Sequence, residues 1–284
     1  MNAHIVARSW TTDQILDRFT RYLVEGTGWS VGPRPDRRMR INVFMPYLVM
    51  QDDPSFQQPH MVAWFTHREE AWPAKALMWD NAERDAHLRL ACSAMYVKSL
   101  AEHGPAARVT APLERDKFTI RENVIKHGKP RIGFSGYVYK TGRKGEKMVA
   151  QLVAEHPEWD IVASGSGWPC QCGEYTWHDV QRFYQSLDVY VCSATVEGLP
   201  MPPLEALSCG IKTVIPWHVG LLDEIYPVEG VVRYERGDYA QMERAIEIAL
   251  DTDAKPQELR DATAGYTVAA WCADFEGAIN AMDW

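Results

Sequence analysis

The sequence lacks any run of 18 apolar residues, the length that a helix needs to cross a lipid bilayer. Its first 14 residues also lack the apolar core of a secretory signal peptide. We therefore expect a cytoplasmic protein without a membrane span. Internal repeats and low-complexity segments are missing too, and 46% apolar with 24% charged residues exclude a disordered or collagen-like chain.

Cysteine is sparse and dispersed, at Cys92, Cys170, Cys172, Cys192, Cys209 and Cys272. In a cytoplasmic chain of this size we expect reduced thiols and no disulfide framework. Cys170 and Cys172 form a C-x-C pair, whereas zinc ribbons use C-x-x-C. This pattern favours a loop whose thiols are buried or have no functional role over a zinc site, so no metal site is predicted.

The 284 residues carry a net charge of −8, which argues mildly against a nucleic-acid-binding protein. The charge is uneven along the chain. Residues 1–126 carry 17 basic and 15 acidic residues, whereas residues 127–284 carry 13 and 23. The length and this asymmetry indicate two domains with different partners.

The first half opens with helical spacing of apolar residues over 12–25, for which Thr12 is a plausible cap. A basic loop rich in proline and glycine follows at 32–40, and apolar runs predict strands over 41–49 and 61–66. Residues 112–129 are polar, contain proline and glycine, and are interpreted as a linker.

Regular alternation of strands and helices begins after this linker. The pattern predicts strands over 131–135, 159–163, 189–192 and 213–216, and helices over 146–155, 179–186, 203–208 and 239–250. Such alternation is typical of a parallel sheet with right-handed crossovers. Ligands bind at the carboxyl ends of the strands in these sheets, so the residues just after each strand are the candidates.

Two glycine turns follow the first two of these strands. Gly136 to Gly145 contains Arg143 and Lys144 and leads into a helix, which suits an anion because backbone N–H groups and the helix dipole add to the two cations. The alternative is a solvated turn. Gly165, in the turn at 164–167, would permit close approach of a ligand, although this stretch taken alone favours a plain tight turn.

The stretch after the strand at 189–192 is the most informative. It holds Glu197 in a loop and Glu205 at the start of a helix. A carboxylate at a strand's carboxyl end can accept hydrogen bonds from sugar hydroxyls, and a second can hold a ribose diol. The alternative is that Glu197 is solvated and Glu205 only complements the helix dipole.

These segments occur in an order that resembles a known family. The stretch E-G-L-P-M-P-P-L-E is similar to the E-x7-E signature of GT4-like retaining glycosyltransferases with the GT-B fold. The turn F-S-G-Y-V-Y-K-T-G-R-K-G, the segments I-V-A-S-G-S-G and F-Y-Q-S-L-D-V-Y-V-C-S-A, and the strand and loop I-K-T-V-I-P-W-H-V-G match in the same order. The resemblance covers about residues 130–275.

The resemblance implies an α/β protein of GT-B type, with two Rossmann-like domains facing a cleft. Residues 1–120 would form a reduced N-terminal domain on the acceptor side, and 129–284 the domain that binds the nucleotide sugar. The last helix, around 269–284, would cross back to the first domain. The first half departs from the family, because it opens with a helix and lacks a Gly-Gly loop.

The resemblance also implies roles for individual residues. Glu197 would contact the donor sugar near its anomeric carbon, Glu205 the ribose, and His67, at the end of the strand at 61–66, the transferred sugar. Further donor contacts would come from Gly136, Lys140, Arg143, Lys144, Gly165, Gly198, Leu199, Pro200 and Met201. Because Tyr137 follows Gly136 where the family often has arginine, Lys140 or Arg143 would supply that charge.

The expected activity is a retaining transfer of sugar from a nucleoside-diphosphate sugar to an acceptor hydroxyl. Neither a cofactor nor a metal is expected, and Asp52-Asp53 is not the D-x-D of metal-dependent enzymes. The acceptor stays open between a saccharide, a lipid and a hydroxymethylated DNA base, the last as in compact bacteriophage enzymes. Four arginines of the basic loop could meet a DNA backbone or form a solvated surface: Arg34, Arg37, Arg38 and Arg40.

Two other classes of function are compatible with parts of this pattern. An inactive sugar-nucleotide-binding scaffold subunit is the main alternative, although the spacing of Glu197 and Glu205 with the glycines argues against it. A GT-B phosphorylase would need a pyridoxal-phosphate lysine or a free-phosphate site, and nothing in the sequence indicates either.

Overall fold

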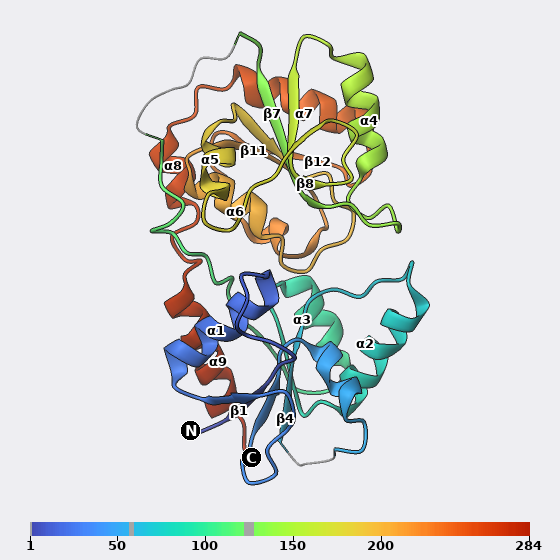
Figure 1. The fold of residues 1–284 in the computed structure, drawn as a ribbon, viewed down its shortest axis with the longest axis vertical. Helices are drawn as coiled ribbons and strands as arrows, with labels where there is room; N and C mark the ends of the chain where they lie inside the picture. The colour runs from blue at the N-terminus through green and yellow to red at the C-terminus, as the bar shows by residue number, and fades with distance from the viewer. Residues whose placement is uncertain (1, 57–59, 122–127) are drawn as a thin grey trace. The chain divides into compact units, whose positions relative to one another are not determined.

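The computed structural model describes residues 2–56, 60–121 and 128–284. The chain divides into two compact units, drawn in Figure 1. The N-terminal unit contains the chain up to Pro112 together with Tyr266–Trp284, and the C-terminal unit is Leu113–Gly265. Residues 122–127 of the stretch interpreted as a linker lie outside the described residues.

The N-terminal unit is built on a parallel sheet with the strand order β2-β1-β3-β4-β5-β6. Its strands are β1 (His4–Val6), β2 (Ser30–Gly32), β3 (Asn42–Phe44), β4 (Met61–Phe65), β5 (Leu88–Ala91) and β6 (Ala106–Arg108). Its helices are α1 (Ile15–Thr27), α2 (Pro73–Asp85), α3 (Ala94–Leu100) and α9 (Val268–Asn280), with 3-10 turns η1 (Tyr47–Asp52) and η2 (Ala101–His103).

The expectation that the chain opens with a helix is wrong, because strand β1 comes first. All three β1 residues are buried, so the strand shows no alternation and is too short for its composition to mark it. Helix α1 begins at Ile15, and Thr12 does not cap it but donates a hydrogen bond to Asp17. The strand expected over 41–49 is also shorter, since the chain turns into η1 after Phe44.

Large aromatic side chains cover the two faces of this sheet. On one face Trp64 of β4 packs against Phe19 of α1 and Trp271 of α9, with ring centroids 6.0 and 5.2 Å away. Helices α1 and α9 lie side by side here (Figure 1), and a Cβ on Gly26 would meet the Cys272 Sγ at 2.3 Å. On the other face Trp79 of α2 packs on Phe65. The end of the chain thus completes the core of its first unit.

The C-terminal unit contains a second parallel sheet, in the order β12-β11-β10-β7-β8-β9. Its strands are β7 (Arg131–Tyr137), β8 (Asp160–Ser166), β9 (Gln171–Gly173), β10 (Val189–Val191), β11 (Lys212–Pro216) and β12 (Val231–Tyr234). Its helices are α4 (Glu146–Glu155), α5 (Val180–Gln185), α6 (Met201–Ser208), α7 (Tyr239–Asp251) and α8 (Pro256–Asp261), with the 3-10 turn η3 (Gly220–Glu224). In the described residues both sheets therefore have six strands, and each unit is Rossmann-like.

Alternate residues of each strand face opposite helical layers. Phe134, Val191 and Val214 join one buried cluster with residues of α4 and α7. Tyr190 points to the other side, where its ring lies 5.8 Å from that of Tyr184 on α5. Because β10 pairs directly with β7, the loops that follow these two strands emerge next to each other.

Among the described residues, none of the helices combines the length and apolar character that crossing a bilayer requires.

Candidate functional site

A narrow crevice lies at the carboxyl ends of β7 and β10 in the C-terminal unit. Its wall is formed by residues of both strands, of the loops after them, of the segment after β8 and of the start of α6: Ser135, Lys144, Trp168, Tyr190, Val191, Cys192, Ser193, Ala194, Glu197, Pro200, Pro202 and Pro203. Its volume is about 20 Å³, room for about one water molecule. Two segments that the sequence singled out, 136–145 and 193–206, thus meet at one place.

Hydrogen bonds join these two segments along their backbones. The Thr195 backbone N–H donates to the Arg143 carbonyl at 2.8 Å, and the Ser193 hydroxyl donates to the Lys144 carbonyl at 2.7 Å. Gly145, with φ of 73°, is needed here, because a Cβ would lie 2.2 Å from the Ser193 carbonyl oxygen. The glycine turn and the Glu197 loop therefore form one rigid element.

Three charged side chains converge where the segments meet. Glu197 Oε1 accepts hydrogen bonds from Arg143 Nη1 at 2.7 Å and forms an ion pair with Lys144 Nζ at 2.6 Å. The side chains of Arg143, Lys144 and Glu197 are only 10%, 16% and 11% exposed. We call these residues the charged triad. Two cations and one carboxylate leave a net positive charge in a poorly solvated place, which favours an anion.

The guanidinium of Arg143 is held on two further sides. Its Nη1 also donates to the Val196 carbonyl at 3.1 Å, and its Cζ lies 4.3 Å from the centre of the Tyr139 ring. A hydrogen bond and a cation–π contact thus restrain the guanidinium. Lys140, by contrast, is exposed in the same turn and is not one of the triad.

Gly220 packs closely against the backbone of the loop that carries Glu197. A Cβ on Gly220 would lie 2.3 Å from the Glu197 carbonyl oxygen and 2.7 Å from that of Gly198. The Leu221 backbone N–H donates to the Gly198 carbonyl at 3.2 Å. After Leu199 the chain enters helix α6 at Met201, preceded by Pro200. Gly198, Leu199, Pro200 and Met201 thus lead directly from Glu197 into the helix that holds Glu205.

Glu205 is buried against an aromatic wall. The Tyr184 hydroxyl donates to Glu205 Oε2 at 2.5 Å, and the hydroxyls of Tyr190 and Ser135 are 2.9 Å apart. Burial, together with the nearby Glu205 carboxylate, raises the pKa of Tyr184 above its usual range, so its phenol stays protonated and can donate. Tyr184 therefore fixes one oxygen of the Glu205 carboxylate.

Gly136 and Gly165 are packed together beneath the turn. A Cβ on Gly165 would lie 2.3 Å from the Gly136 carbonyl oxygen, and that oxygen accepts a hydrogen bond from Trp168 Nε1 at 2.8 Å. A Cβ on Gly136 would lie 3.3 Å from Lys144 Nζ. Both glycines have φ above 100°, so the close approach and the backbone conformation require glycine at each position.

Sequence reasoning missed four residues that shape this site: Ser135, Trp168, Tyr184 and Tyr190. They are core aromatics or a strand serine whose roles depend on contacts across the sheet. The one available signal was alternation in the strand over 189–191, where Tyr190 stands between two valines and so must face the other side.

In the N-terminal unit, His67 follows strand β4 and is buried. Its Nε2 lies 3.1 Å from Lys75 Nζ and 3.5 Å from Glu69 Oε2. The Tyr47 hydroxyl is 3.5 Å from the His67 carbonyl oxygen. His67 thus belongs to a buried polar cluster at the carboxyl end of its strand, the position that the sequence predicted for it.

The arginines of the basic loop lie in the connection between β2 and β3. Arg40 contacts the Trp284 carbonyl just before β3 begins, and the Arg34 carbonyl accepts from the His4 ring at 3.0 Å. The Arg38 guanidinium forms two hydrogen bonds with Asp36, and the Arg37 Cζ stands 5.8 Å from the centre of the Phe56 ring. The Arg38 side chain nevertheless stays 88% exposed.

The second cysteine of the C-x-C pair lies within an edge strand, and the first precedes that strand. Gln171–Gly173 forms β9, which leaves Cys172 exposed and Cys170 partly buried. Burial raises the pKa of the Cys170 thiol to about 12. In the part of the chain that the structure describes, no group of three or more His, Cys, Asp and Glu side chains is arranged to hold a metal ion.

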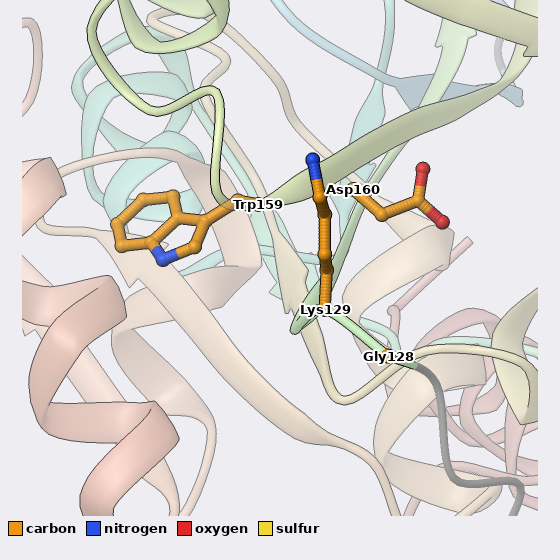
Figure 2. Close-up of a pocket in the computed structure, with 4 residues that line it drawn as sticks. All are labelled: Gly128, Lys129, Trp159 and Asp160. Carbon is orange, nitrogen blue, oxygen red and sulfur yellow. The ribbon is translucent and has the colours of Figure 1, made fainter.

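A larger hollow, of about 310 Å³, opens at the amino ends of strands β7 and β8 in the C-terminal sheet. Gly128 and Lys129 precede β7, and Trp159 and Asp160 stand at the start of β8 (Figure 2). The Lys129 ammonium donates to the Pro157 carbonyl at 2.6 Å. The hollow thus lies at the amino ends of the strands, away from the charged triad.

Both units are Rossmann-like, and their fold matches that of solved GT-B glycosyltransferases. Within the C-terminal unit, residues 171–265, about a third of the chain, match the family model described as glycosyl transferases group 1. This segment includes Glu197 and Glu205. Among curated proteins, none matches the sequence.

Solved structures resemble the whole chain in fold at low sequence identity. Sucrose-phosphate synthase from Thermosynechococcus elongatus has a TM-score of 0.79 at 12% identity, over 98% of both chains. HepE of Anabaena, in complex with UDP-glucose, has a TM-score of 0.70 at 13% identity, over 99% of this chain and 100% of its own. The lipopolysaccharide outer core galactosyltransferase WaaB reaches 0.71 at 11%, over 99% of each.

Proposed function

We propose that the protein transfers a sugar from a nucleoside-diphosphate sugar to an acceptor hydroxyl, with retention of configuration and without a metal ion. The observation that carries the proposal is the charged triad at the carboxyl ends of β7 and β10. The group 1 match over residues 171–265 and the GT-B fold support it. So does the fact that HepE, which shares the fold, is known in complex with UDP-glucose.

The chemistry requires a departing nucleoside diphosphate to be stabilised beside an oxocarbenium-like centre. Preorganised cations and N–H donors perform this task without reorganisation. Arg143 and Lys144 would bind the diphosphate, with Lys140 and the turn around Gly136 and Gly165 beside them. The two cations would supply the positive charge for which other transferases use a divalent metal.

The remaining roles follow the order of the chain. Glu205 would hold the ribose diol, and Glu197 would contact the donor sugar near its anomeric carbon. The backbone of Gly198, Leu199, Pro200 and Met201 would contact sugar and phosphate oxygens. His67 would bond a hydroxyl of the transferred sugar. The acceptor would attack from the side of the leaving group, and the departing phosphate would take its proton.

The donor site is tested first by thermal shift with UDP-, GDP-, TDP- and ADP-sugars. A donor at 100 times its Kd stabilises the protein by about 2.7 kcal/mol, which raises the melting temperature by several degrees. We expect one nucleotide to give a selective shift. Transfer is then measured with saccharide, lipid and hydroxymethylated DNA acceptors, in the presence and absence of EDTA.

A matched pair of lysine variants tests the assignment of the anion site. Lys144→Met should abolish most of the donor-induced shift, because it removes a charge of the triad. Lys140→Met removes the same charge from an exposed position of the same turn and should cost less. A protein that folds, but neither binds nor hydrolyses any nucleotide sugar, would contradict the proposed function.

A further inference from the structure

The contacts of Glu197 raise a question that a role toward the donor sugar does not answer. A single carboxylate oxygen, Glu197 Oε1, contacts both cations: the Arg143 guanidinium at 2.7 Å and the Lys144 ammonium at 2.6 Å. In the proposed function these same two cations bind the diphosphate of the donor. A phosphate oxygen that binds the same N–H groups at this point competes with the carboxylate oxygen for them.

The space around the triad strengthens this point. The crevice lined by Lys144, Ser193 and Glu197 holds about 20 Å³, so protein atoms closely surround the two cations on this side. The Ser193 hydroxyl and the Thr195 backbone N–H donate hydrogen bonds that join its walls. A phosphate that reaches the cations here therefore competes with the Glu197 carboxylate for them.

We propose that Glu197 is a competing counter-ion for the phosphates of the nucleotide and thereby sets the preference between donor and product. This inference rests on the proposed function. Its carboxylate weakens binding of phosphate by holding the two cations and by repelling negative charge that arrives beside them. The free nucleoside diphosphate carries more negative charge than the nucleotide sugar, because its terminal phosphate is not esterified. Glu197 therefore disfavours the product more than the donor, which aids product release.

The opposite role for Glu197 would be to hold Arg143 and Lys144 in place for the phosphate. The two roles predict opposite signs for the same substitution. If Glu197 competes, Glu197→Gln frees both cations and tightens phosphate binding. If Glu197 only positions the cations, the same substitution loosens them and weakens phosphate binding.

The experiment is a calorimetric titration of wild type and Glu197→Gln with UDP, UMP and uridine, or the equivalent series of the base that the donor screen selects. These probes carry no sugar at the β-phosphate, so a lost sugar contact cannot affect the result. We expect the variant to bind the diphosphate about tenfold more tightly, the factor that 1.4 kcal/mol represents, with a smaller gain for the monophosphate and none for the nucleoside. Transfer from the nucleotide sugar should fall.

A control variant distinguishes the loss of the Glu197 ion pairs from the general effect of removing a negative charge near the turn. Glu146→Gln removes one negative charge at the first residue of helix α4, close to the same turn. Among the described residues, Glu146 forms no ion pair with Arg143 or Lys144, so its gain should be much smaller. Circular dichroism and the melting temperature check that both variants fold.

The outcomes separate the inference from the proposed function. Equal or weaker diphosphate binding by a folded Glu197→Gln variant, with a wild type that binds and transfers, would overturn the inference alone. An equal gain for uridine would overturn it too, because the effect would then not depend on phosphate. A wild type that binds no nucleotide and no nucleotide sugar would overturn both.

Discussion

A hydrogen bond from Tyr184 helps to hold the buried carboxylate of Glu205. Glu205 is 5% exposed, and burying a carboxylate is costly unless hydrogen bonds compensate its lost hydration. Tyr184 supplies such a bond from a buried ring, because its phenol stays protonated and donates to the carboxylate oxygen. Tyr190 makes a similar bond nearby, but to the neutral Ser135 hydroxyl.

This difference predicts unequal effects for two identical substitutions. Tyr184→Phe removes one hydrogen bond to a buried carboxylate and should lower the free energy of unfolding by about 1–3 kcal/mol. Tyr190→Phe loses a bond between neutral groups and should cost about 1 kcal/mol. Urea denaturation of both variants measures the difference. Equal decreases in the free energy of unfolding would mean that the hydrogen bond to Glu205 stabilises the protein no more than the bond between Tyr190 and Ser135.

At the scale of elements, the site depends on the junction between the turn at 136–145 and the loop at 193–197. Strand β10 pairs with β7 although more than 50 residues separate them in the chain, and this pairing sets the two loops side by side. The bonds from Ser193 and Thr195 then fix their spacing. Arg143 and Lys144 reach Glu197 only because this junction is tight.

Two glycines of the turn offer a matched test of the junction. Gly142 and Gly145 have φ of 74° and 73°, so an alanine at either position costs a similar backbone strain of about 1–2 kcal/mol. A Cβ at Gly142 would approach nothing closer than Glu146 Oε1 at 3.7 Å, whereas at Gly145 it would lie 2.2 Å from the Ser193 carbonyl oxygen.

We therefore expect Gly142→Ala to be modestly less stable and to keep nucleotide binding. Gly145→Ala should be less stable than that and should lose most of its binding, because the turn must separate from the 193–197 loop. Denaturation curves and nucleotide titrations measure both quantities. Similar binding by the two variants would show that the junction does not control the site.

At the scale of the whole molecule, the chain returns to its first unit before it ends. Trp271 of α9 is fully buried and packs on Phe19 of α1, Trp64 of β4 and Phe275. The N-terminal unit therefore lacks part of its core until the last 19 residues, Tyr266–Trp284, have joined it. Its stability depends on residues that follow the entire C-terminal unit in sequence.

Removing this aromatic contact should weaken one unit selectively. Trp271→Ala leaves a large cavity between α1, α9 and β4 and should cost the N-terminal unit about 3–5 kcal/mol. Hydrogen exchange should then accelerate in peptides of α1 and β4, with little change in β7, β8 and β10. Trp72→Ala in the same unit removes a side chain that is 55% exposed and is the control. Uniform acceleration in both units would contradict their energetic separation.

The local signals in the sequence predicted much of the C-terminal unit. Helix α4 occupies Glu146–Glu155 as expected, and the strands over 131–135, 189–192 and 213–216 are found within two residues of the expected ends. Short edge strands such as β9 and β12 were missed, and so was β1. Three or four residues with little alternation carry too weak a pattern to separate a strand from a loop.

The sequence by itself determined the chemistry that is available: two cations after one strand, a carboxylate after another, and glycines where the backbone needs φ above zero. Only the tertiary structure decided that Arg143, Lys144 and Glu197 share one carboxylate oxygen, and that Tyr184 holds Glu205. The physical reason is strand order. Strands β10 and β7 pair because burying both faces of the sheet favours this strand order. The two strands are far apart in the chain, so no local pattern in either segment predicts how close their loops lie.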